Sequence, residues 1–158
     1  PMVMRGLPVP REKQLYIVLD AKRKAETLGL AFGRIADPVG APTERGLAVL
    51  HRAMGIGRGL AFLRSFMRGV WAEGINAGTD KGLQMLAVRA GLDAQFVAAA
   101  LADDSWRAVA TANRDEMLAT GLWGVPSFRV NDGVARWGQD RLWLVEDDLR
   151  RAQHTATD

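Results

Sequence analysis

Most of the chain carries apolar residues three and four positions apart, which is the period of an amphipathic helix. A series of such stripes runs from Leu15 to Met117. The predicted stripes span residues 15–28, 47–54, 63–71, 83–90, 96–100 and 106–117. We therefore expect a protein in which helix far exceeds strand.

Capping residues set the boundaries of these predicted helices. Glycine tolerates the positive φ of the position just past a helix, and Ser, Thr and Asp accept hydrogen bonds from first-turn N–H groups. We expect helices to end at Gly29, Gly74, Gly91 and Gly121. We expect N-caps at Thr43, at Thr79 or Asp80, at Asp93, and at Asp104 or Ser105.

Two of the stripes predict which side chains are buried, because the apolar face of a helix usually faces the core. After Thr43, the spacing predicts an apolar face of Leu47, Leu50, His51 and Met54. In the helix predicted over residues 60–73, we expect burial of Leu63, Phe66, Met67, Val70 and Trp71.

Strand patterns appear only near the two ends of the chain. Residues 2–7 predict one strand, and Pro126 opens another that we expect to run through Val130. An Asn-Asp-Gly turn over residues 131–133 should join it to a second strand of a hairpin that ends at Gly138, because these residues tolerate positive φ.

A candidate ligand site lies where this hairpin meets the last predicted helix. Proline has no N–H, so Pro126 belongs at the first residue or edge of a strand, and the backbone of Val125 is then free to bind something else. Gln139 and Asp140 precede an apolar stripe over residues 142–149, which makes Asp140 the expected N-cap.

The motif at this site resembles a known family. Gly124, Val125 and Pro126, followed by Trp-Gly-Gln-Asp-Arg over residues 137–141, carry the likeness. Residue by residue, this block resembles the 2-hydroxychromene-2-carboxylate isomerase and kappa-class glutathione transferase family, a DsbA-like branch of the thioredoxin fold. The likeness extends more loosely upstream and covers nearly the whole chain.

The resemblance implies a fold. We expect a mostly helical α/β protein of the thioredoxin-like, DsbA or kappa type, with a large all-helical insertion and with the family's first strand and helix absent. Residues 1–158 would form a single domain, with 1–9 and 121–153 as the thioredoxin-like part and 10–120 as the mainly helical insertion. Because the chain opens on Pro1 without that strand and helix, we expect a fragment or a gene product that lacks its front.

The resemblance also implies a cofactor. In this family a cis proline lies antiparallel to the cysteinyl part of glutathione, and the segment matching residues 137–141 meets the γ-glutamyl end. We therefore expect a cis Val125-Pro126 bond and a Val125 backbone that is unpaired without ligand. The residues expected to bind glutathione are Val125, Pro126, Gln139, Asp140 and Arg141. The resemblance further implies that Trp71 covers a pocket for a small aromatic substrate.

The leading functional hypothesis is a glutathione-dependent isomerase or transferase that acts on a small aromatic substrate and forms a homodimer. A DsbA-like thiol-disulfide oxidoreductase relative would share the Pro126 loop but needs a cysteine. A non-catalytic fragment or binding remnant is the third alternative. Family members place a Ser or Cys at a helix start to contact the glutathione sulfur. Because no such segment occurs here, we assign no catalytic residue and expect little activity from the chain alone.

Composition narrows the function classes. At 158 residues, with 48% apolar and 25% charged residues, the chain has the composition of one globular domain. Its zero cysteines exclude disulfides, thiolate metal sites and redox chemistry by the chain itself. The net charge of +3 is mild and no nucleic-acid-binding motif occurs, so we expect no nucleic-acid partner.

No apolar run approaches the roughly 18 residues of a membrane span, and no signal peptide opens the chain. We therefore expect no membrane partner and a cytoplasmic location. The chain's two histidines are His51 and His154. His51 lies on an apolar stripe with no dyad partner at helical spacing, which favours a core or groove histidine. We expect neither a catalytic triad nor a metal site.

Overall fold

The structure is a computed structural model that describes residues 10–155. The strand predicted over residues 2–7 therefore lies outside the described residues. The chain divides into two compact units, Pro1–Trp106 and Arg107–Asp158. As predicted, helices dominate and strands are few.

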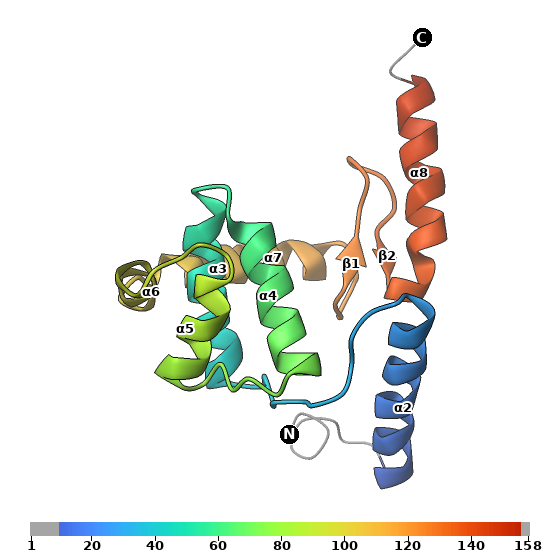
Figure 1. The fold of residues 1–158 in the computed structure, drawn as a ribbon. Coiled ribbons are helices and arrows are strands. Elements are labelled where there is room, and N and C mark those ends of the chain that lie inside the picture. The colour runs from blue at the N-terminus through green and yellow to red at the C-terminus, as the bar shows by residue number, and fades with distance from the viewer. Residues whose placement is uncertain (1–9, 156–158) are drawn as a thin grey trace. The chain divides into compact units, whose positions relative to one another are not determined.

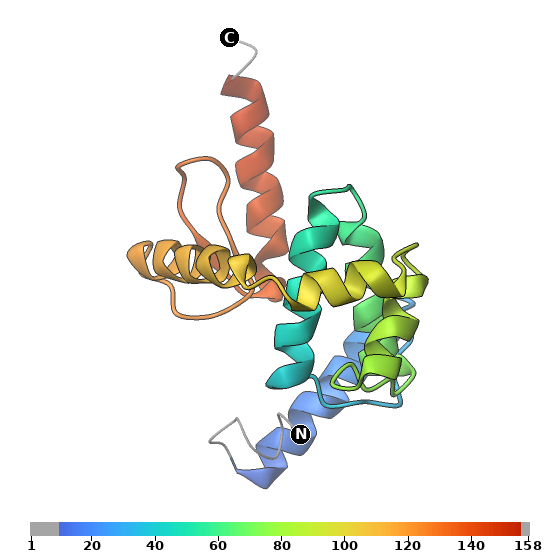
Figure 2. The same ribbon diagram turned by 90° about the vertical axis from the view of Figure 1, so that its left-hand side faces the viewer.

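The first unit is built from helices (Figure 1). They are α2 (Arg11–Thr27), α3 (Ala41–Met54), α4 (Gly59–Ala72), α5 (Asp80–Val88) and α6 (Ala94–Leu101). Helices α3 to α6 gather around one core, as the second view shows (Figure 2). The buried residues of this core are Val49, Ala53, Phe62, Val70, Ala77, Leu83, Leu86, Ala87, Ala90, Leu92, Val97 and Ala100. The apolar stripe predicted on α2 is mostly exposed, and Ala25 alone among its described residues is buried.

Most of the predicted helix boundaries are confirmed. The Thr79 hydroxyl accepts a hydrogen bond from Gly82 N, and the Asp93 carboxylate accepts one from Phe96 N. The four predicted terminal glycines all have positive φ. The N-cap predicted at Thr43 is wrong. Helix α3 starts earlier, with Gly40 as N-cap and Pro42 in its first turn, where a missing N–H costs nothing.

The predicted buried faces of α3 and α4 are partly wrong. Met54 and Leu63 are 67% and 41% exposed, whereas Phe62 on the neighbouring face of α4 is 1% exposed. The reason is close packing at small residues. Leu86 of α5 lies so near Gly69 that a side chain there would collide, and the Ser65 hydroxyl donates to the Leu86 carbonyl at 2.8 Å.

A similar close approach fixes the buried face of α3. A Cβ on Gly46 would lie 2.6 Å from the ring of Phe66, so α3 turns its small residues toward α4. Gly46, Val49 and Ala53 are buried as a result, while Leu47 is 37% exposed. The spacing of bulky residues therefore predicted the helices but not the faces on which they pack.

The second unit holds most of α7 (Ser105–Ala119), a small hairpin and the last helix. Strands β1 (Ser127–Phe128) and β2 (Arg136–Trp137) pair antiparallel, and the short 3-10 helix η1 (Gln139–Arg141) leads into α8 (Leu142–Thr155). The strand expected to reach Val130 ends at Phe128, because the Val130 carbonyl already accepts the turn hydrogen bond from Gly133 N.

Burial differs between the two units. Among residues 107–154, no side chain is buried to the degree of the first unit's core. The large apolar side chains that remain exposed in this unit include Val109, Leu118, Trp123, Val134, Trp143 and Leu149. The second unit is therefore organised by backbone pairing and polar contacts rather than by a core of its own.

Candidate functional site

The loop before β1 is fixed by local hydrogen bonds. The Val125-Pro126 peptide bond is cis, as expected. The Ser127 hydroxyl donates to the Gly124 carbonyl at 2.5 Å, and Gly138 N donates to the Pro126 carbonyl at 3.0 Å. The second bond connects the loop to the end of β2 and brings Val125 and Pro126 to the start of η1.

Val125 is the most exposed large apolar residue at this site, with 81% of its surface accessible. Within residues 10–155, neither its N–H nor its carbonyl has a hydrogen-bond partner, as predicted. A free donor and a free acceptor on one residue can pair with an extended peptide as a neighbouring strand would. The loop thus presents an exposed and unpaired backbone donor and acceptor.

Two tryptophans pack against each other next to Gly124. The rings of Trp123 and Trp137 lie with centroids 4.6 Å apart at an interplanar angle of 44°. A Cβ on Gly124 would lie 2.5 Å from the Trp137 Nε1 atom, so glycine is needed between them. Sequence reasoning missed Trp123, although its place directly before the Gly-Val-Pro motif was a usable signal.

The start of the last helix differs from the prediction. Asp140 is not an N-cap, because η1 precedes α8, has Gly138 as its N-cap and shows no side-chain capping bond. The Asp140 carboxylate instead accepts a hydrogen bond from Arg141 Nη1 at 2.6 Å. It also leans over Gly138, whose φ of 101° and lack of a side chain make room for it.

Asp140 and Arg141 are both more than half exposed, with side-chain accessibilities of 63% and 51%. They offer an anion and a cation on adjacent residues beside Gln139. The first N–H groups of a helix have no intrahelical acceptor and carry partial positive charge. This corner therefore suits a zwitterionic group that bears both an ammonium and a carboxylate.

An ion pair connects the hairpin to the last helix. Arg136 of β2 donates to the Asp148 carboxylate of α8 from Nε at 3.1 Å and Nη2 at 3.3 Å. This hydrogen bonding is the main cause that lowers the pKa of Asp148 and raises the pKa of Arg136 from their ordinary values. The pair holds β2, and hence Gly138 and η1, against α8.

Trp71 lies on α4 in the first unit, whereas the five predicted glutathione contacts lie in the second. Its indole stacks on the ring of Phe32, with centroids 6.4 Å apart and an interplanar angle of 11°. Its backbone carbonyl accepts a hydrogen bond from Gly33 N at 3.0 Å. The indole is half-buried against the helical core, so Trp71 has a packing role.

His51 is half-buried, and its Nε2 atom lies 3.4 Å from the Ser105 hydroxyl oxygen. Asp103, rather than the histidine, organises this cluster. Its carboxylate accepts hydrogen bonds from the Ser105 backbone and side chain, which lower the pKa of Asp103 and satisfy the first turn of α7. The hydrogen bond from the Ser105 backbone N–H makes Asp103 a capping residue at the start of α7.

Comparison with known proteins identifies the family. The family profile described as a DSBA-like thioredoxin domain matches residues 2–150, nearly the whole chain. The chain belongs to the DSBA-like thioredoxin domain family. The DsbA-like thioredoxin fold expected from the C-terminal motif is therefore confirmed.

Solved structures agree with this assignment. The probable DsbA oxidoreductase from Streptomyces coelicolor is 30% identical, with a TM-score of 0.69 over 87% of this DSBA-like chain and 59% of its own. The selenomethionine form of 2-hydroxychromene-2-carboxylate isomerase is 19% identical, with a TM-score of 0.74 over 99% of this chain and 76% of its own. The DSBA-like chain thus spans 59% of the Streptomyces protein's length. A search of the curated proteins gives no match.

Within residues 10–155, no helix of the DSBA-like chain has the length and apolar character to cross a membrane. No group of three or more His, Asp or Glu side chains there is arranged to hold a metal ion.

Proposed function

We propose that the chain binds glutathione at the Val125 loop and serves a glutathione-dependent isomerisation or transfer on a small aromatic substrate. The observation that carries this proposal is the exposed Val125 backbone, which has no partner among the described residues. Glutathione is a short extended peptide, and its cysteinyl unit would pair with Val125 N–H and carbonyl beside Pro126.

The γ-glutamyl end of glutathione would lie at η1. Its ammonium would displace Arg141 from the Asp140 carboxylate, because both cations need the same acceptor. The released Arg141, together with Gln139 and the free first-turn N–H groups, would then bind the γ-glutamyl carboxylate. Charge-assisted hydrogen bonds of this kind contribute about 1.5–3 kcal/mol each.

The aromatic substrate is proposed from the likeness to 2-hydroxychromene-2-carboxylate isomerase, whose name specifies a bicyclic ring carboxylate. We propose that Trp71 borders the substrate, that the functional unit is a homodimer and that the protein is cytoplasmic.

A thiol-disulfide oxidoreductase lineage is the second candidate, favoured by the 30% identity to the probable DsbA oxidoreductase. Disulfide exchange needs a thiolate, and the 158 residues contain no cysteine. In that lineage the chain would contribute the peptide-binding loop of Val125 and Pro126 without the redox step. Non-catalytic peptide binding by this loop is the remaining alternative.

Titration calorimetry with reduced glutathione on the full chain tests the proposal. We expect saturable binding, and we expect Asp140→Asn to weaken it about tenfold or more, because the amide removes the charge that binds the ammonium. Asp132→Asn in the exposed hairpin turn is the matched control and should leave the affinity unchanged.

Cysteinylglycine, which lacks the γ-glutamyl group, separates the two halves of the site. We expect it to bind more weakly than glutathione and equally to the parent chain and to Asp140→Asn. Absence of glutathione binding would reject the proposal. Equal binding of glutathione to the parent and Asp140→Asn would restrict the site to the Val125 loop.

A further inference from the structure

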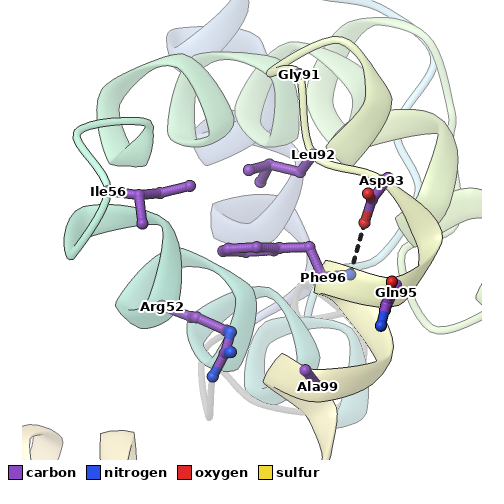
Figure 3. Close-up of a pocket in the computed structure, with 8 residues that line it drawn as sticks. All are labelled: Arg52, Ile56, Gly91, Leu92, Asp93, Gln95, Phe96 and Ala99. Carbon is purple, nitrogen blue, oxygen red and sulfur yellow. Dashed lines mark hydrogen bonds between the residues drawn. The ribbon is translucent and has the colours of Figure 1, made fainter.

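A pocket lies entirely within the first unit, between the end of α3 and the start of α6 (Figure 3). Its volume is about 340 Å³, enough for a small organic molecule. Ile56, Leu92 and Phe96 form its apolar side, and Arg52, Asp93 and Gln95 supply its polar groups. No residue of the Val125 loop contributes to it.

The apolar side of this pocket is pre-formed. Leu92 is 2% exposed, and Phe96 packs against the helical core, so both side chains are held in place. Gly91 has a φ of 76°, which turns the chain between α5 and α6 and directs Leu92 inward. In Figure 3, Leu92 and the Phe96 ring both point across the pocket toward Ile56, which is 58% exposed at its rim.

Arg52 provides a cation that is already positioned. Its guanidinium carbon lies 5.5 Å from the centroid of the Phe96 ring, a cation–π geometry that restrains the side chain. Within residues 10–155, Arg52 makes no ion pair. Arg52 also lowers the pKa of Asp103 through its charge, but the main cause of that shift is the hydrogen bonding from Ser105. The guanidinium N–H groups of Arg52 are therefore available to donate hydrogen bonds to a ligand.

Asp93 places a carboxylate at one end of the pocket. Its carboxylate accepts the Phe96 N–H at 2.7 Å and is held beside the backbone of α6, at the end of the pocket away from Ile56. An anionic ligand would be repelled from Asp93 and attracted to Arg52, below the Phe96 ring. The pocket thus combines an apolar surface with the cation of Arg52.

From this arrangement we propose that the pocket binds a small planar monocarboxylate with an apolar body. The body would lie against Leu92, Phe96 and Ile56, and the carboxylate would accept hydrogen bonds from Arg52. Every group that the inference uses belongs to the first unit, so it does not rest on glutathione binding.

Nuclear magnetic resonance of the uniformly ¹⁵N-labelled full chain tests this inference, with 2-naphthoate as the probe. We expect saturable shifts of the Arg52, Leu92 and Phe96 amides, with a dissociation constant of about 1 mM or tighter. Arg52→Gln should weaken binding about tenfold, because it removes a charged donor. Arg64→Gln, an exposed arginine on α4, is the matched control and should leave the affinity unchanged.

Two further probes separate the charge from the apolar contact. Neutral 2-naphthamide should bind about tenfold more weakly than 2-naphthoate, and acetate should leave these amides unshifted. Ile56→Ala should weaken 2-naphthoate severalfold with little effect on folding, because Ile56 is mostly exposed. Equal affinity of naphthamide and naphthoate, or of the parent and Arg52→Gln, would overturn the proposal, as would the absence of saturable shifts.

Discussion

At the scale of single residues, Gly124 shows how a missing side chain shapes the candidate site. A Cβ at this position would lie 2.5 Å from the Trp137 indole nitrogen, closer than side chains pack. We therefore predict that Gly124→Ala pushes Trp137 away from Trp123, at a cost of about 1–3 kcal/mol for overpacking. Near-ultraviolet circular dichroism, which reports the environment of tryptophan rings, would show the change.

Gly55→Ala provides the control for this substitution. Gly55 has a φ of −62°, and the nearest atom to a Cβ there lies at 3.4 Å, an ordinary contact. Its spectrum should match that of the parent chain. A Gly124→Ala spectrum that is also unchanged would mean that the loop accepts a side chain without moving Trp137.

The sequence predicted the local geometry of the Val125 loop. The resemblance carried by the Gly-Val-Pro motif led to the cis Val125-Pro126 bond, and the missing N–H of Pro126 also predicted the unpaired Val125 backbone. The helix-start rule misplaced Asp140, because it takes no account of a 3-10 turn before α8. That rule expected the Asp140 carboxylate to accept hydrogen bonds from backbone N–H groups. The carboxylate instead accepts a hydrogen bond from the adjacent Arg141 side chain.

At the scale of elements, Glu73 joins the ends of two helices. It follows α4 and accepts hydrogen bonds from Arg68 Nε at 2.8 Å and from Arg89 Nη1 at 2.5 Å, just after α5. The Arg89 bond, followed by that of Arg68, lowers the pKa of Glu73 below its ordinary value of 4.5. The carboxylate therefore stabilises the folded state above pH 4.5, and this stabilisation is lost as the pH falls through the lowered pKa.

We predict that Glu73→Gln reduces the fall in stability between pH 7 and about pH 3, because the amide cannot lose a charge. Urea unfolding at both pH values, followed by far-ultraviolet circular dichroism, measures the difference between the two proteins. Glu26→Gln, on the exposed surface of α2, should retain the pH dependence of the parent chain. The same pH dependence in Glu73→Gln and the parent would exclude a role for these hydrogen bonds in stability.

Helix ends were predictable from sequence where the signal is local. Thr79 and Asp93 cap their helices because their side chains reach N–H groups three residues ahead, whatever surrounds them. The packed faces were not predictable in the same way. Gly46 and Gly69 let neighbouring helices approach, so the helices meet at their smallest residues rather than their largest.

At the scale of the whole molecule, burial is concentrated in the first unit. Phe62, Leu83 and Leu86 are at most 1% exposed, whereas no side chain over residues 107–154 is comparably buried. Regions with few buried apolar contacts open at lower free energy than a core does. We predict that amides of β1, β2 and α8 exchange with deuterium faster than those of α4 and α5.

Native-state hydrogen exchange with mass spectrometry of peptic peptides measures this difference. Glutathione, if it binds as proposed, should slow exchange in the peptide that contains Val125 and leave the α5 peptide unchanged. Equal exchange rates in the two units would mean that both unfold together.

Leu83→Ala should destabilise the first unit by about 2–5 kcal/mol, because it leaves a cavity in the core.

The buried core and the Val125 loop belong to different units, which has an evolutionary consequence. Substitutions over residues 107–154 remove little buried surface, so most of them should leave the stability of the helical unit intact. Many substitutions in the loop sequence, and with them changes in ligand preference, could therefore accumulate during evolution before the stability of the helical unit limits further substitution. Gly124 and Gly138 would be the positions where that drift is most restricted, because both lack room for a side chain.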